Sequence, residues 1–173
     1  MTHGVQITPV QRLRQLLARD GHTAAAPIFD PFSARVAEMQ GWEVMKLSGS
    51  FAKFANLGVP DDLPLTNMSD LVDIAHRINR ACDLPLLVDA DDAGGNALTV
   101  RRTVRELEAV GVAAIEIEDN AVPQCTGHAE RRHSLMLSAE EQVGKLRAAV
   151  AARRNRETVI VARTFALSEL PRA

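Results

Sequence analysis

The sequence is poor in aromatic residues, with no tyrosine, one tryptophan and five phenylalanines among 173 residues. It also has no marked excess of charge of either sign, since 20 lysines and arginines stand against 22 aspartates and glutamates. Proteins that bind nucleic acid usually carry a basic patch, often with aromatic residues between the basic ones. Because both features are missing, we predict no nucleic-acid partner and no attraction to an anionic membrane.

Cysteines and long apolar runs are also scarce. The two cysteines, Cys82 and Cys125, form no Cys-x-x-Cys pair, which indicates a reducing compartment. The N-terminal stretch MTHGVQITPVQRLRQLL has no long apolar core, and no other stretch is long enough to span a bilayer. We therefore expect no signal peptide, no membrane span and a cytoplasmic location.

The sequence does contain a regular alternation of apolar strands and amphipathic helices. Hydrophobic residues make up 46% of the chain, enough for a sizeable core in one domain. Thr8 and Pro9 begin a helix expected over residues 8–20, and further helices are expected over residues 31–41, 68–82, 97–110 and 138–152. Strands are expected to begin near residues 23, 44, 84, 113 and 158. This alternation predicts a parallel sheet covered by helices.

Two α/β architectures fit this alternation, a doubly wound open sheet and a β/α barrel. Polar residues follow each expected strand: Asp30, residues 48–50, residues 89–91, residues 116–119 and Arg163. Such residues at the carboxyl ends of several strands are typical of the barrel. A dinucleotide-binding open sheet would carry Gly-x-Gly-x-x-Gly after its first strand, and that motif is missing. We therefore predict a (β/α)8 barrel of the TIM type.

The chain is short for a complete barrel of this kind. Such a barrel usually needs about 250 residues and at least roughly 200. This chain has 173 residues and ends soon after the fifth expected strand. We therefore expect residues 1–173 to form a single partial barrel domain with about five of the eight β/α units, and we interpret the chain as truncated.

Acidic residues gather at the ends of two expected strands. The stretch LPLLVDADDAGGNALTV passes from an apolar run into Asp89, Asp91 and Asp92. Side chains alternate along a strand, so Asp89 and Asp91 share a face, as do Glu116 and Glu118 on the next strand. If the two strands are parallel neighbours, their acids meet at one edge of the sheet.

This group of acids has two interpretations. Oxygen ligands with no Cys or His pair nearby suit a hard cation, Mg²⁺ or Mn²⁺, better than zinc. Alternatively, the polar residues at the strand ends only cap the helices that follow, and Asn96 and Asp119 are suitably placed to do so.

These residues also belong to a longer pattern. The run VDADDAGGNALTVRRTVRELEAVGVAAIEIEDN, with FDPFSAR, LSGS, GVPD and VART in the same order, resembles the isocitrate lyase and phosphoenolpyruvate mutase superfamily over nearly the whole chain. The resemblance implies a β/α barrel, Mg²⁺ as the metal and a small 2-oxo or 2-hydroxy acid as the ligand. It also implies a homotetramer in which a helix is exchanged between subunits.

Site residues follow from the same resemblance, position by position. It implies that Asp89, Asp91 and Glu118 bind the metal. Substrate-binding and catalytic roles fall on Ser48, Gly49, Ser50, Asp61, Asn96, His128 and Arg163. The backbone amides of residues 48–50 would hold a substrate carboxylate, and an arginine can clamp a carboxylate with two hydrogen bonds. A 2-oxo acid that chelates Mg²⁺ leaves an enolate stabilised by the metal when its carbon–carbon or carbon–phosphorus bond breaks.

Three segments depart from the pattern of the superfamily. Isocitrate-type lyases carry a Lys-Lys/Arg-Cys-Gly-His loop, but here the loop reads VPQCTGHAERRH, with Thr126 at the cysteine position. This disfavours an isocitrate-type lyase, because proton transfer requires hydrogen-bond reach. In addition, Ala93-Gly94 replaces Gly-Tyr, and Phe165 replaces the Asp or Asn that follows Ala-Arg-Thr.

The segments FDPFSARVAEMQGWEVMKLSGS and SAEEQVGKLRAAVAAR are most similar to the oxaloacetate decarboxylase branch. We therefore expect a Mg²⁺-dependent lyase that converts oxaloacetate to pyruvate and CO₂. The alternatives are a methylisocitrate- or isocitrate-type lyase and a phosphonopyruvate mutase or hydrolase. A truncated, non-catalytic paralogue is the alternative of another class.

Overall fold

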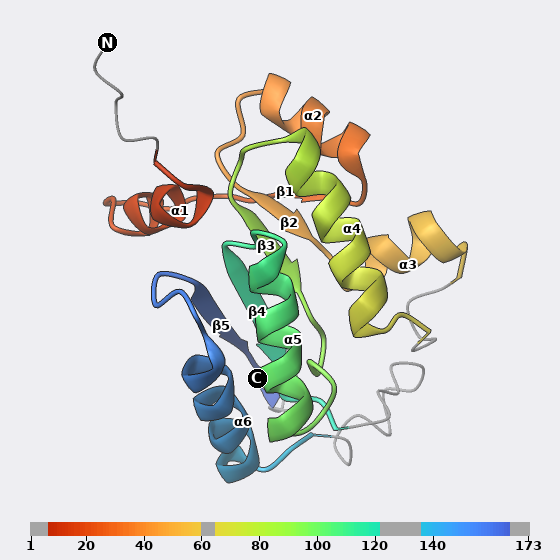
Figure 1. The fold of residues 1–173 in the computed structure, drawn as a ribbon, viewed down its shortest axis with the longest axis vertical. Coiled ribbons are helices and arrows are strands. Elements are labelled where there is room, and N and C mark those ends of the chain that lie inside the picture. Colours follow the sequence, from red (N-terminus) through yellow and green to blue (C-terminus); the bar gives the residue numbers. More distant parts are fainter. Residues whose placement is uncertain (1–6, 60–64, 122–135, 167–173) are drawn as a thin grey trace, which may run out of the picture.

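Five short strands alternate with six helices along the part of the chain that the structure describes. The computed structural model describes residues 7–59, 65–121 and 136–166. In chain order (Figure 1), the elements are α1 (Pro9–Leu17), β1 (Ala26–Ile28), α2 (Pro31–Met39), β2 (Met45–Leu47), α3 (Gly49–Leu57), α4 (Met68–Ala81), β3 (Leu86–Asp89), α5 (Ala97–Ala109), β4 (Ala114–Glu118), α6 (Ala139–Ala152) and β5 (Val159–Arg163). None of these helices is long and apolar enough to cross a membrane.

Polar N-cap residues determine where most of the helices begin. Thr8 accepts a hydrogen bond from the amide of Gln11, and the Gln11 side chain bonds back to the Thr8 amide. The same reciprocal capping box is present at four other N-caps: Asp30, Asn67, Asn96 and Ser138. Each box satisfies two N–H groups that have no partner within the helix. The helix starts predicted from the sequence are therefore confirmed to within a residue.

The end of α1 differs from the prediction. We expected a helix over residues 8–20, but α1 ends at Leu17. The amide of Ala18 bonds to both Arg14 and Gln15, and the amide of Arg19 bonds to Leu16, three residues back. Such three-residue bonds tighten the last turn, so the chain leaves the α-helix before it reaches Gly21.

The sheet has the strand order of a barrel wall. Its order is β1-β2-β3-β4-β5, and every neighbouring pair is parallel. A doubly wound sheet reverses its strand order near the middle, whereas a β/α barrel keeps the order of the sequence. The chain therefore forms an incomplete β/α barrel with five of the eight strands. Among the described residues, β1 and β5 are the two ends of this wall.

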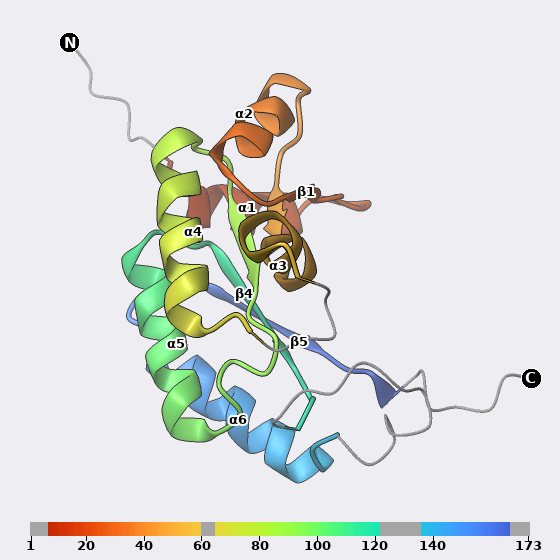
Figure 2. The same cartoon turned by 90° about the vertical axis from the view of Figure 1, so that its right-hand side faces the viewer.

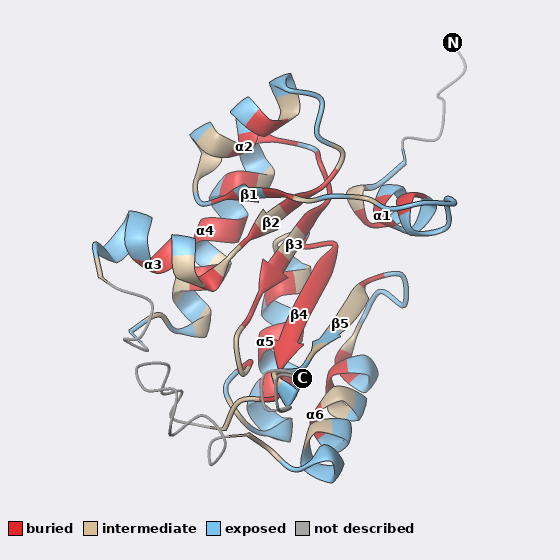
Figure 3. Ribbon diagram, turned by 180° about the vertical axis from the view of Figure 1, so that it is seen from behind, coloured by how far each residue is buried: buried red, intermediate tan, exposed pale blue. Residues whose placement is uncertain are grey.

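The main hydrophobic core lies between the sheet and its helices. Helices α2, α4, α5 and α6 lie on one side of the sheet (Figures 1 and 2), and Figure 3 shows the strands from the opposite side. Helix α4 buries Leu71, Ile74, Ala75 and Ile78, which have helical spacing along one face. They join the outward-facing residues of the strands in a single cluster that includes Met45, Leu47, Leu86, Val88, Ile115 and Ile117. We call this helix-covered side of the sheet the outer face.

Helix α1 belongs to a second, smaller core on the inner face, the opposite side of the sheet. Val10, Leu13 and Leu16 of α1 pack with Val44, Ala113 and Ala114 and with the partly buried Leu87, Val159 and Val161. These strand residues lie at or near the amino ends of β2 to β5. Helix α1 therefore covers the amino-terminal end of the inner face and leaves the carboxyl ends of the strands for polar residues.

Helix α3 was missed by the sequence analysis. We expected the stretch EVMKLSGS to be a strand that closes on small residues, but β2 ends at Leu47 and α3 begins at Gly49. Its N-cap Ser48 makes no side-chain capping bond, so the usual signal of a helix start is absent. Its end has a clear signal, because Gly58 adopts the left-handed conformation (φ 66°) that favours glycine.

Candidate active site at the carboxyl ends of the strands

Alternation along the strands places five charged side chains on the inner face. The outward residues Met45, Leu47, Leu86, Val88, Ile115 and Ile117 are buried in the outer core. The residues that alternate with them along the strands therefore point inward, and these include Lys46, Asp89, Glu116 and Glu118. Arg163 of β5 points the same way, because it pairs with Glu118. The register pairs Asp89 with Glu116, and Glu118 with Arg163. The prediction that the acids of β3 and β4 meet at one edge is confirmed.

Three of the acids form a group that can hold a metal ion. Asp89, Asp91 and Glu118 each offer a carboxylate oxygen, and the three oxygens lie within 4.8 Å of one another. Asp91 follows the end of β3 and has a positive φ of 49°, a left-handed conformation that Asp adopts more readily than most residues. The amide of Glu118 bonds to the Asp91 carbonyl at 2.8 Å. This bond fixes the turn that brings Asp91 back to the strand ends.

The chemistry of this group fits Mg²⁺ or Mn²⁺. All three side chains offer hard oxygen ligands, and Asp89 and Glu118 are buried. Burial and the charge of Glu116 raise the pKa of Asp89, and burial and the charge of Asp89 raise the pKa of Glu118 to about 8. A bound divalent cation would favour the ionised form of both carboxyls. The metal ligands inferred from the resemblance are thus brought together around one point.

Arg163 lies directly beside two acids of the metal group, Asp89 and Glu118, and beside Glu116. Its Nη1 atom is 2.7 Å from Glu118 Oε1, 3.0 Å from Glu116 Oε1 and 3.3 Å from Asp89 Oδ2. The guanidinium carbon lies 4.8 Å from the centre of the Phe165 ring, a cation–π contact. Phe165, a departure from the family pattern, therefore stacks on the arginine. The Arg163 side chain is 40% exposed, so part of it remains accessible to a ligand.

Two lysines in the same region were not singled out from the sequence. Lys46 Nζ lies 2.9 Å from both carboxylate oxygens of Glu116. Lys53 in α3 is only 1% exposed, and its Nζ lies 3.8 Å from Asp91 Oδ2. In the sequence, Lys46 can be recognised as a charged residue between two apolar residues, Met45 and Leu47, of an expected strand. Lys46, Lys53 and Arg163 thus bring three cationic side chains to the four carboxylates of this region, which are Asp89, Asp91, Glu116 and Glu118.

The predicted carboxylate-binding residues Ser48, Gly49 and Ser50 form the start of α3. A Cβ atom on Gly49 would lie 2.9 Å from Asp91 Oδ1, so a larger residue here would force the Asp91 carboxylate to move. The backbone amides at a helix N-terminus suit an anion. Residues 48–50 therefore lie against the metal group, although their role towards a substrate stays a prediction.

The capping interpretation applies to some polar residues and not to others. Asn96 accepts hydrogen bonds from the amides of Leu98 and Thr99 and caps α5. Asp119 instead accepts hydrogen bonds from the Thr164 hydroxyl and the Phe165 amide, which fasten the end of β5. The capping alternative is thus confirmed for Asn96, whereas Asp119 holds the end of β5 and Ser138 caps α6, the next helix in the described part of the chain. A substrate contact of Asn96 stays a prediction.

Some expected site residues fall outside the described residues. Asp61 and His128, both predicted to act in catalysis, lie there, as do Cys125 and Thr126. Their roles stay predictions.

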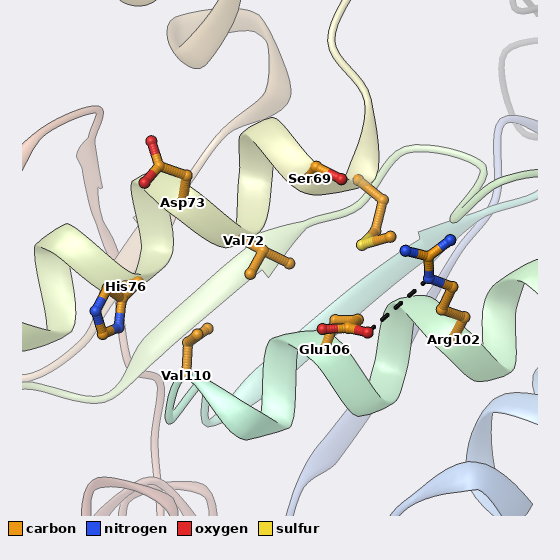
Figure 4. A pocket seen from close by; sticks show the side chains of 8 residues that line it. Ser69, Val72, Asp73, His76, Arg102, Glu106 and Val110 are labelled. Carbon is orange, nitrogen blue, oxygen red and sulfur yellow. Dashed lines mark ion pairs between the residues drawn. The ribbon is translucent and has the colours of Figure 1, made fainter.

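A separate hollow lies on the helical layer. Its volume is about 350 Å³, and it is lined by residues of α4 and α5 that include Val72, His76, Arg102 and Glu106 (Figure 4). On α5, Arg102 Nε lies 3.9 Å from Glu106 Oε1, one helical turn away. None of its lining residues belongs to the inner-face group, so we do not assign it to the active site.

Comparisons with known proteins agree on one family. The family described as phosphoenolpyruvate phosphomutase matches residues 13–171. An oxaloacetate decarboxylase of Paraburkholderia xenovorans is 43% identical over 159 residues, which cover 92% of this chain and 52% of that protein. Oxaloacetate decarboxylase 1 of Pseudomonas fluorescens is 46% identical over 156 residues, covering 90% and 53%. The chain spans about half the length of the curated relatives it matches.

Solved structures give the same result. Phosphonopyruvate hydrolase in complex with oxalate and Mg²⁺ is 33% identical with a TM-score of 0.81, covering 93% of this chain and 54% of that chain. Oxaloacetate acetylhydrolase in complex with the inhibitor 3,3-difluorooxalacetate is 31% identical with a TM-score of 0.84, covering 95% and 56%. The predicted superfamily and barrel fold are confirmed.

Proposed function

The chain belongs to the phosphoenolpyruvate phosphomutase family, and from this premise we propose that it is a Mg²⁺-dependent lyase that decarboxylates oxaloacetate to pyruvate and CO₂. One observation carries the proposal: the oxygens of Asp89, Asp91 and Glu118 converge within 4.8 Å of one another, beside Arg163. The names of the relatives at 43% and 46% identity support oxaloacetate as the substrate. Catalysis by this chain, which spans half of those relatives, is part of the proposal.

The residues of the chain have distinct roles in this reaction. Asp89, Asp91 and Glu118 would hold the cation, which supplies positive charge next to the oxygen of a developing enolate. Arg163 would bind a substrate carboxylate, since its guanidinium is partly exposed and lies next to the cation ligands. The backbone amides at the start of α3, where Gly49 lies next to the Asp91 carboxylate, would also bind a substrate carboxylate.

The chemical step requires no acid from the protein when CO₂ leaves. The electrons of the broken carbon–carbon bond pass into the ketone and give the enolate of pyruvate, and CO₂ departs without a proton. A proton taken up afterwards at carbon gives pyruvate. This is consistent with Thr126 at the position where isocitrate-type lyases carry a cysteine.

We also propose that copies of the chain associate in the cytoplasm, as in the homotetramer implied by the resemblance. Helix α2, next to the terminal strand β1, exposes Phe32 by 76% and Met39 by 80%. The two side chains are seven residues apart and lie on one face of the helix, and an exposed apolar face of this kind can become buried in an interface. Light scattering coupled to size-exclusion chromatography tests this, and a monomer at all concentrations would contradict it.

The proposed function is tested by binding first and turnover second. A thermal melt with Mg²⁺ and oxalate, an enolate mimic, should shift upwards only when both are present. At 100 times the dissociation constant the expected stabilisation is about 2.7 kcal/mol. Pyruvate release from oxaloacetate is then measured with Mg²⁺ and with a chelator.

The controls separate the alternatives. Phosphonopyruvate and 2-methylisocitrate are assayed beside oxaloacetate, and faster turnover of either would replace the proposed substrate. The variant Glu118→Gln should show neither the melt shift nor turnover. Binding without turnover of any substrate would indicate a non-catalytic paralogue, and the absence of both would disprove the proposed function.

A further inference from the structure

Glu116 is the inner-face acid that lies outside the metal group. It is 6% exposed and faces the same side of the sheet as Asp89 and Glu118. Among the described residues, however, these two and Asp91 form the group that can share an ion, without Glu116. The Glu116 carboxylate instead contacts two cations. Both of its oxygens lie 2.9 Å from Lys46 Nζ, and Oε1 also accepts a hydrogen bond from Arg163 Nη1 at 3.0 Å.

Lys46 reaches Glu116 across a whole strand. The register pairs Lys46 of β2 with Leu87 of β3, and Leu87 with Ala114 of β4, so Lys46 starts one layer below Glu116. Its ammonium binds both carboxylate oxygens, which fixes the plane of the carboxylate. A buried carboxylate without such a partner would be strongly destabilising. Lys46 therefore holds the Glu116 carboxylate in one orientation.

Arg163 is divided between three carboxylates, two of which belong to the metal group. Its Nη1 atom contacts Glu118, Glu116 and Asp89. A divalent cation on Asp89 and Glu118 would take one oxygen of each carboxylate and repel the guanidinium, which weakens these two contacts of Arg163. Glu116 is not part of the metal group, so its contact with Arg163 would keep both of its oxygens available.

We propose that Glu116 is a positioning residue: it keeps Arg163 beside the cation when Asp89 and Glu118 are engaged, and Lys46 holds Glu116 in place for this purpose. The proposal rests on the proposed function, in which Arg163 binds a carboxylate of a 2-oxo acid. Glu116 contacts neither substrate nor metal, and it acts through Arg163.

The test measures two affinities by isothermal titration calorimetry. Mg²⁺ is titrated into the metal-free protein, and oxalate is then titrated into the Mg²⁺-saturated protein. Glu116→Gln should weaken oxalate binding roughly 10- to 100-fold, the effect of losing a charge-assisted hydrogen bond. Mg²⁺ affinity should stay within about threefold of the wild type, because the three ligands are intact.

A double variant separates positioning from a structural role. Lys46→Met with Glu116→Gln removes one charge of each sign and leaves no buried ion unpaired, so it serves if the single variant folds poorly. Its oxalate affinity should remain low although its charge balance is restored. Glu106→Gln, at the exposed Arg102 pair of α5, is the matched control and should leave both affinities unchanged.

The outcomes are distinct. If the folded double variant binds oxalate within about twofold of the wild-type affinity, the positioning role of Glu116 is wrong, and the proposed function is unaffected. An equal loss of Mg²⁺ and oxalate affinity in that variant also overturns it, because it indicates a structural role. If the wild-type protein itself binds no oxalate with Mg²⁺, the proposed function fails, and this inference fails with it.

Discussion

The two faces of the sheet are built on opposite principles. On the outer face, apolar residues of β1 to β4 pack against apolar residues of the helices, and the buried Lys145 of α6 hydrogen-bonds to the Glu118 carbonyl at 2.7 Å. On the inner face, at the carboxyl ends of the strands, each of four carboxylates lies within ion-pair distance of at least one of three cationic side chains. The outer face stabilises the fold, whereas the inner face gathers charges that burial alone disfavours. Variants on the two faces should therefore affect different properties.

The largest expected effect is on the outer face. Leu107 is fully buried, so Leu107→Ala should lower the free energy of unfolding by about 2–5 kcal/mol. Mg²⁺ affinity of the folded fraction should not change, because Leu107 is not part of the inner face. Denaturant titration measures the loss, and Leu98→Ala, at an 80% exposed position of the same helix, is the control. A similar loss in both variants would contradict the assignment of this core.

The second prediction concerns a metal ligand on the inner face. Glu118→Gln should weaken Mg²⁺ binding roughly 100-fold or more, since one of three carboxylate ligands is lost. Stability without metal should stay the same or rise, because burial disfavours the charge of this carboxylate. Calorimetric titration and a thermal melt test the two parts. A variant that loses stability but keeps its Mg²⁺ affinity would show that Glu118 stabilises the fold and does not bind the metal.

The third prediction concerns pH. The pKa of Glu118 is raised from its ordinary value of 4.5 to about 8, chiefly by burial. Between these values the folded protein keeps a proton that the unfolded chain has lost, so stability without metal should fall as pH rises through this window. Mg²⁺ must displace the proton, so its apparent affinity should rise by at most about tenfold per pH unit up to pH 8.

Glu118→Gln is the control for this pH dependence. Its stability and Mg²⁺ affinity should change less between pH 6 and 8 than those of the wild type. Melts and titrations at four or five pH values give both quantities. A wild-type Mg²⁺ affinity that is flat over the same range would contradict the raised pKa.

The smallest expected effect concerns Lys53. Its buried ammonium lies 3.8 Å from Asp91 Oδ2 and competes electrostatically with a cation bound there. Lys53→Met keeps much of the volume and removes the charge, so Mg²⁺ affinity should rise several-fold, up to about tenfold. Lys53→Arg keeps the charge and is the comparison. A lower Mg²⁺ affinity in Lys53→Met, at unchanged stability, would show that Lys53 supports the site.

The outer face could be predicted well from the sequence because its signals are local. The strands begin one to three residues from the expected positions, α4 begins at Met68 as expected, and Asn96 caps α5 as predicted. Apolar residues with helical spacing, such as those of α4, indicate their own side of the helix. Helix α3 escaped prediction because Ser48 makes no capping bond and glycine opens the helix.

The inner face could be predicted only in part. Alternation along β3 and β4 correctly brought Asp89 together with Glu116 and Glu118. It also placed Asp91 beside Asp89, although Asp91 lies beyond β3 in a turn with positive φ. The metal-binding and carboxylate-binding roles came from the resemblance. The pairing of Lys46 with Glu116 was not foreseen, because it joins residues 70 positions apart across an intervening strand. Such long-range pairs depend on register and side-chain reach, which a local pattern does not contain.

The order of the strands also bears on how the chain is made. Each of β2 to β5 pairs with the strand that precedes it in the sequence. On a ribosome, every new strand therefore emerges when its partner is already available, and no strand has to wait for one synthesised much later. Pairing between strands that are close in the sequence lowers the entropic cost of closing the loop between them, and it favours rapid assembly. The wall of the barrel can thus grow in one direction, from β1 to β5, as translation proceeds.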